Sequence, residues 1–142
     1  MLILKFFILW LTFGVLGYAQ DPVGVWRTMD DKTGKPRGTV RLYLEDGEVF
    51  GKIESSVDPN NAADLCGLCP GDRKNKPIIG LVILRRMKKA SGEWTGGDIL
   101  DPDTGQLYRC KFKITENGLR MVLRGYVGIS LLGRSQVWTR VQ

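Results

Sequence analysis

Two cysteines, three positions apart, are the residues of this chain whose spacing most directly suggests a reaction. The Cys66-x-x-Cys69 pair has the spacing of a thiol–disulfide oxidoreductase site. Such a site needs a following helix whose N-terminus lowers the pKa of the first thiol, whereas Pro70, Gly71 and a polar run without apolar period come next here. We predict a disulfide that staples a loop, with thiol redox chemistry as an alternative function.

The third cysteine, Cys110, lies on the apolar side of an alternating segment. A free cysteine at such a position behaves as a small hydrophobic residue, so we expect Cys110 to point into the core. Its pairing with Cys66 or Cys69 stays open at this point, because connectivity cannot be read from spacing.

Other catalytic and metal-binding groups are scarce. The 142 residues include no histidine, which excludes Ser-His-Asp and Cys-His nucleophile pairs and His-ligated zinc. Asp98, Asp101 and Asp103 lie close together, but Asp101–Gly105 has the composition of a turn and lacks the distal glutamate of a calcium loop. We therefore predict a non-enzymatic protein without catalytic residues, metal or cofactor.

The N-terminal segment has the pattern of a secretory signal peptide. Lys5 precedes an apolar run from Phe6 to Leu16, and Gly17 and Ala19 supply small residues before a cleavage point after Ala19. The run is shorter than the roughly 20 residues that a membrane-spanning helix needs. The sequence predicts export to the periplasm or medium, with residues 1–19 removed and residues 20–142 left as one domain.

Export affects which partners the positive charge could attract. The net charge is +6 for the chain and +5 once Lys5 is removed. We expect no nucleic-acid partner for an exported protein. The basic group Arg85, Arg86, Lys88 and Lys89 is interpreted as a solvated strand end that offers at most peripheral contact with the cell envelope.

Alternating apolar and polar residues, separated by Gly, Asp, Asn and Pro, indicate an all-β fold. Asp46-Gly47 and Asn117-Gly118 are strong signals for two-residue hairpins, and Ser55–Pro77 is the one long connection. The expected strands are Val23–Met29, Thr39–Glu45, Glu48–Glu54, Ile78–Met87, Glu93–Leu100, Leu107–Thr115, Leu119–Val127 and Arg134–Val141. Closing eight antiparallel strands into an up-and-down barrel removes both sheet edges; a β-sandwich is the alternative.

In a closed barrel the first and last strands are neighbours. Trp26, in the Gly24-x-Trp26 motif, can then stack against the Arg140 guanidinium and close one end. An eight-stranded barrel either is filled by its own side chains or holds one small ligand. The predicted pocket residues are Trp26, Leu42, Leu44, Val49, Tyr108, Phe112, Leu123 and Trp138, with the Ser55–Pro77 loop as a lid.

Several motifs occur together in one order along the mature chain. They are Gly24-x-Trp26, Cys66-x-x-Cys69, Gly80–Leu84, Trp94–Pro102, Gly105-x-x-Tyr108 with Cys110, Arg124-Gly125-Tyr126 and Gln136-x-Trp138-x-Arg140. In these motifs the chain resembles a family of small exported bacterial proteins known as domain of unknown function 2147. The resemblance implies a lipocalin-like barrel in the periplasm or cell envelope, without an established reaction or ligand.

The leading hypothesis is an exported binding protein that holds a small, largely apolar molecule in or at the mouth of the barrel. A structural or protein-interaction module of the envelope is the alternative, beside the thiol redox role. Neither the ligand nor the oligomeric state follows from the sequence.

Overall fold

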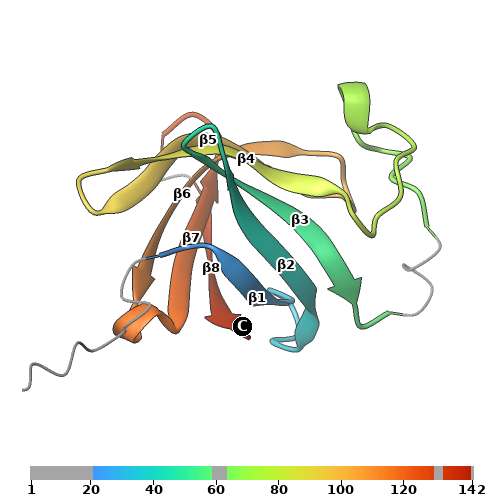
Figure 1. Ribbon diagram of the computed structural model, residues 1–142. Coiled ribbons are helices and arrows are strands. Elements are labelled where there is room, and N and C mark those ends of the chain that lie inside the picture. The colour runs from blue at the N-terminus through green and yellow to red at the C-terminus, as the bar shows by residue number, and fades with distance from the viewer. Residues whose placement is uncertain (1–20, 59–63, 130–132, 142) are drawn as a thin grey trace, which may run out of the picture.

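Alternation of inward apolar and outward polar side chains builds eight antiparallel strands that close into a barrel (Figure 1). The computed structural model describes residues 21–58, 64–129 and 133–141, so the predicted signal peptide lies outside the described residues. The strands are β1 (Gly24–Met29), β2 (Pro36–Glu45), β3 (Glu48–Ser56), β4 (Val82–Ala90), β5 (Glu93–Leu100), β6 (Leu107–Thr115), β7 (Arg120–Tyr126) and β8 (Gly133–Arg140).

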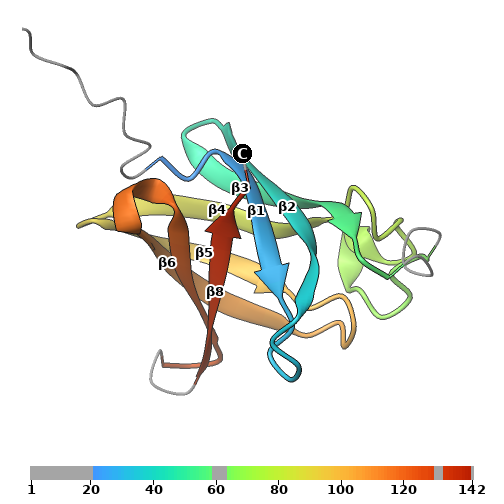
Figure 2. The same ribbon diagram turned by 90° about the horizontal axis from the view of Figure 1, so that it is seen from below.

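Each strand pairs with the next along the chain, and β8 returns to β1. The closing ladder consists of the pairs Trp26–Arg140 and Arg27–Thr139. Figure 2 shows β1 and β8 meeting beside the C-terminus and then diverging along the barrel. The predicted eight-stranded up-and-down barrel is confirmed, and the β-sandwich is excluded because its first and last strands would not close one sheet.

The predicted strand Ile78–Met87 begins later than expected, at Val82. Gly80 adopts a φ of +91°, and the Leu81 amide donates to the Ile78 carbonyl, so the chain turns before β4 starts. Ile78 instead donates its amide to the Asp64 carbonyl in the preceding loop. An apolar run on both faces did not distinguish this turn from the strand that follows it.

The two hairpin signals have different outcomes. Asp46 and Gly47 form the expected two-residue turn inside the Glu45–Glu48 pair. The Asn117-Gly118 prediction was wrong in length: β6 and β7 pair last at Thr115–Arg120, so four residues connect them, three of them in the 3₁₀ turn Glu116–Gly118.

The predicted strand Leu119–Val127 extends too far at both ends. A period of two residues would put Leu119 and Val127 on its inward, apolar side, but both are exposed. β7 covers only Arg120–Tyr126, so Leu119 and Val127 lie in the connections beyond it.

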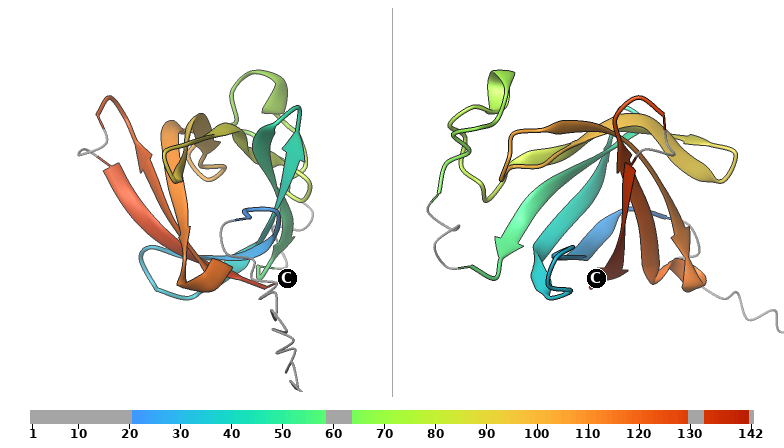
Figure 3. Two further views of the ribbon diagram at one scale, coloured as in Figure 1. Left: turned by 60° about the vertical axis from the view of Figure 1, so that its left-hand side comes forward. Right: turned by 180° about the vertical axis from the view of Figure 1, so that it is seen from behind.

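The two ends of the barrel differ. At the end that we call the closed end lie the β2–β3, β4–β5 and β6–β7 turns, the start of β1 and the end of β8 (Figure 3). Side chains that fill this half are almost fully buried: Trp26, Leu42, Val49, Met87, Phe112 and Met121. The other four connections lie at the opposite end, the open end. In the described part of the chain, no helix is long and apolar enough to cross a membrane.

Candidate ligand cavity at the open end

A cavity of about 760 Å³ occupies the open half of the barrel. About half of its lining is polar. The apolar part includes eight aliphatic and aromatic side chains: Val40, Ile53, Ile83, Ile99, Leu100, Tyr108, Leu123 and Trp138. Gly125 helps to keep this space open, because a Cβ there would lie 3.4 Å from the Tyr108 Cβ and 3.6 Å from an Ile99 methyl group. A larger residue at position 125 would project between these side chains.

Three of the eight predicted pocket residues line this cavity: Tyr108, Leu123 and Trp138. Four others, Trp26, Leu42, Val49 and Phe112, are buried outside the cavity wall, in the filled half of the barrel. They face inward as expected, but at the wrong depth along the barrel.

Leu44 does not belong to a pocket, since it is 56% exposed. It faces the same side as its cross-strand partner, the buried Val49. However, β1 begins at Gly24, opposite Leu42, so no residue of β1 extends far enough to cover Leu44. The prediction failed because the neighbouring strand is shorter than the β2–β3 hairpin.

Sequence reasoning missed several wall residues. Ile53, Ile83, Ile99 and Gln136 line the cavity but were not proposed as pocket residues. Their depth along the barrel depends on ladder irregularities such as the one between Thr39 and Val40.

The mouth of the cavity is charged. Asp30, Asp31, Asp64, Asp101 and Asp103 line it together with Lys32, Arg37 and Arg134, which gives the lining a net charge of −2. Two ion pairs each join a strand to a connection: Arg37 of β2 with Asp103 at 2.5 Å, and Arg134 of β8 with Asp31 at 3.5 Å. The predicted turn Asp101–Gly105 is present, and Asp101 accepts the Asp103 amide at 2.9 Å.

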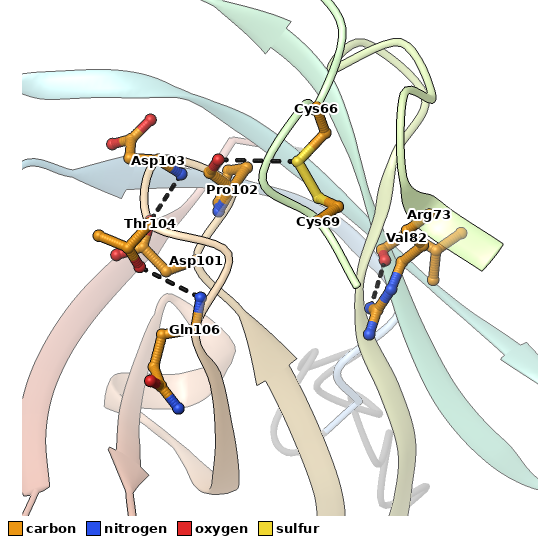
Figure 4. The surroundings of a disulfide bond; sticks show 9 residues. All are labelled: Cys66, Cys69, Arg73, Val82, Asp101, Pro102, Asp103, Thr104 and Gln106. Atoms are coloured by element: carbon orange, nitrogen blue, oxygen red, sulfur yellow. Dashed lines mark hydrogen bonds between the residues drawn. A yellow bond between two sulfur atoms is a disulfide. The ribbon is translucent and has the colours of Figure 1, made fainter. Parts of the chain in front are cut away.

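Cys66 and Cys69 are joined by a disulfide beside this mouth (Figure 4). Both are 2% exposed, and the Cys66 sulfur lies 3.6 Å from the Pro102 carbonyl of the β5–β6 turn. Cys110 is a free, buried thiol, so the pairing of Cys110 with either loop cysteine is excluded. Burial raises the pKa of the Cys110 thiol far above its ordinary value.

The segment after Cys69 does not resemble a redox active site. Pro70 precedes a 3₁₀ turn of three residues, Gly71–Arg73, which is too short to supply the helix N-terminus that activates a thiol. The Arg73 side chain is buried and donates to the Val82 carbonyl at 2.9 Å, and burial lowers its pKa. These contacts hold the loop against β4 and favour the staple interpretation.

The loop predicted as a lid forms part of the rim. From its described residues, Ser55, Ser56, Asp64 and Leu65 line the cavity. The predicted basic group lies elsewhere, on β4: Arg85 is paired with Asp72 at 2.9 Å, and Arg86, Lys88 and Lys89 are exposed.

The predicted closing contact is present at the closed end. The Arg140 guanidinium carbon lies 4.4 Å from the centre of the Trp26 ring. Arg140 also donates to the carbonyls of Gly118, at 2.7 Å, and Val23, at 2.9 Å, and to that of Asp21. It thus connects both ends of the chain to the β6–β7 turn.

Comparison with known proteins gives one family match and one solved structure of similar fold. A family model described as "Uncharacterized protein conserved in bacteria (DUF2147)" matches residues 24–140. Among solved structures, protein HP1028 from Helicobacter pylori, described as belonging to the lipocalin family, is similar with a TM-score of 0.74. The two are 20% identical over 84% of this chain and 82% of that chain, a likeness of fold. No curated protein matches the chain.

Proposed function

Because the chain belongs to the DUF2147 family of bacterial proteins and folds as a lipocalin-like barrel, we propose that it is an exported, non-enzymatic binding protein. Its ligand is one small, largely apolar molecule held in the open half of the barrel. The observation that carries the proposal is the 760 Å³ cavity, whose lining combines aliphatic and aromatic side chains with a polar mouth. Cavities of about 300–1,000 Å³ with such walls are the usual size of small-molecule sites.

Burial of the ligand would supply most of the binding free energy. Each Å² of apolar surface removed from water contributes about 25 cal/mol. The strands that form the walls pair with both neighbours, except that β1 and β8 pair only at the closed end. The floor needs no rearrangement to receive a ligand, because Trp138, Leu123 and Leu100 are already packed against the filled half.

Fluorescence of N-phenyl-1-naphthylamine, an uncharged apolar probe, tests the proposal with the mature protein, residues 20–142. We expect saturable binding of one probe per chain. Ile99→Trp puts an indole into the cavity. It should weaken probe binding at least about tenfold, because the larger side chain occupies space that the probe needs. Val137→Trp, on the outer side of β8, is the matched control and should bind as the wild type does.

Absence of saturable binding to the folded wild type would reject a binding role in this cavity. Equal affinity of the two tryptophan variants would place the probe elsewhere on the protein.

We propose further that the protein acts outside the cytoplasm, which is supported by the signal-peptide pattern of residues 1–19. N-terminal sequencing of protein isolated from a bacterial host should start at Gln20. A chain that begins at Met1 and stays in the cytosolic fraction would refute export.

A further inference from the structure

One amide in the cavity has an orientation fixed by its neighbour. The Trp138 indole donates a hydrogen bond to the Gln136 side-chain oxygen at 2.9 Å. An indole N–H is only a donor, so the partner atom must be the oxygen of the amide. The Gln136 Nε2 group therefore has to present its two N–H bonds in another direction.

These two donors lack a protein acceptor within the described ranges, where Gln136 makes only the bond with Trp138. Gln136 is half-buried and lines the cavity on β8, between Arg134 at the mouth and the almost fully buried Trp138. Its cross-strand partner on β7 is Leu123, another wall residue. A donor on the cavity wall can form a hydrogen bond with an acceptor that the ligand brings.

The charge at the mouth of the cavity indicates whether the ligand's acceptor group is anionic or uncharged. The lining residues carry a net charge of −2, although the whole chain carries +6. Among the described residues, three of the five aspartates, Asp30, Asp64 and Asp101, form no ion pair, and both arginines at the mouth already face a carboxylate. The unpaired aspartates would repel an anionic head group placed at the mouth.

We propose that the ligand is an uncharged amphiphile. Its apolar chain or ring lies against the isoleucine-rich walls, and a carbonyl oxygen accepts a hydrogen bond from Gln136 Nε2. The inference rests on the proposed binding function and specifies the ligand's chemical class.

Competition against bound N-phenyl-1-naphthylamine tests the inference at pH 8 with two competitors of equal chain length. 2-Undecanone carries an uncharged carbonyl, and undecanoate carries a carboxylate. We expect the ketone to displace the probe at a concentration about 3–10-fold lower than undecanoate. Both oxygens can accept from Gln136, but only the carboxylate is repelled by the negative mouth.

Two variants separate the amide donor from the rest of the wall. Gln136→Glu keeps an oxygen for the Trp138 indole but removes both N–H donors, and Gln136→Met removes the polar group altogether. Each should weaken ketone binding about 3–10-fold while the affinity for the probe itself changes less than about twofold. Gln106→Glu makes the same substitution in the β5–β6 turn, outside the cavity, and should have the wild-type affinities.

The outcomes are distinguishable. A wild-type protein that binds no probe refutes the proposed function. Probe binding with undecanoate competing as well as the ketone, or with both Gln136 variants retaining the wild-type ketone affinity, refutes the amide-directed ligand class and leaves apolar binding intact. If a Gln136 variant does not fold, the relative affinities of the wild-type protein for 2-undecanone and undecanoate still test whether the ligand is uncharged.

Discussion

Arg140 shows how much one side chain near the end of the chain can organise. Its guanidinium stacks on Trp26 and donates to three backbone carbonyls from two distant segments, residues 21–23 and Gly118. Those carbonyls have no strand partner of their own at the closed end. A planar group with five N–H donors can meet all three at once.

Arg140→Lys should therefore destabilise the barrel although the charge is kept. A lysine ammonium cannot reach the three carbonyls together, so we expect a loss of about 1–3 kcal/mol in the free energy of unfolding, measured by urea denaturation. Arg120→Lys, where the guanidinium bonds the exposed Glu116 carboxylate at 3.3 Å, is the control and should cost less than about 0.5 kcal/mol. Equal losses in the two variants would contradict a special role for Arg140.

At the scale of elements, the loop between β3 and β4 is held by its own disulfide and by a close contact with the β5–β6 turn. Besides the disulfide, the Leu68 carbonyl sits against Gly105 in the β5–β6 turn: a Cβ at position 105 would lie 1.9 Å from that oxygen. So close an approach of two backbones requires glycine. The loop and the turn thus form one unit at the rim of the cavity.

Gly105→Ala should break this unit, and Gly34→Ala provides a matched comparison. Both glycines have a left-handed φ, +73° and +68°, but a Cβ at Gly34 would meet no atom within 4 Å. The backbone strain is therefore similar, about 1–2 kcal/mol, and the difference measures the contact with Leu68. We expect Gly105→Ala to lower the free energy of unfolding by about 1–3 kcal/mol more than Gly34→Ala does.

Hydrogen exchange would localise that effect. Faster exchange of the Cys66 and Asn75 amides, which bond within the loop, is expected for Gly105→Ala alone. The same exchange rates in both variants would show that the loop does not depend on the turn.

The whole molecule divides into a filled half and a hollow half. Bulky side chains such as Trp26, Met87 and Phe112 fill the closed end, where Arg140 joins the first and last strands. Toward the open end β1 and β8 diverge, the wall contains Gly125 and Gly133, and the cavity begins. The filled half supplies stability, which leaves the hollow half available for a ligand.

Below about pH 8, stability should depend on pH only on the acid side. Arg41 hydrogen-bonds both Glu54 oxygens, at 2.7 and 3.1 Å, and lowers the pKa of Glu54; the hydrogen bond from Arg85 does the same to the pKa of Asp72. A carboxyl with a lowered pKa in the folded state binds protons more readily when unfolded, so its contribution is lost as the pH falls.

The free energy of unfolding should accordingly stay level from about pH 5.5 to 8, because the chain has no histidine to titrate there. It should decrease below about pH 4.5, the ordinary pKa of glutamate, in urea titrations at a series of pH values. A rise in stability over that acid range would contradict the sign of these shifts.

Much of this architecture was decided locally. Alternation at a period of two residues determined the number of strands and the inward side of most of them, because successive side chains point to opposite faces. Asp46-Gly47 determined a turn through its tolerance of positive φ, and the spacing of Cys66 and Cys69 allowed the disulfide that the structure contains.

Depth along the barrel was decided only by the tertiary structure. Alternation cannot tell that Leu42 and Phe112 fill the closed half while Ile53 and Ile99 line the cavity, because all four share the inward side. The length of β1 exposes Leu44, and the β6–β7 register exposes Leu119. The free N–H groups of Gln136 likewise depend on which nonlocal side chain pairs with its oxygen and which walls surround it.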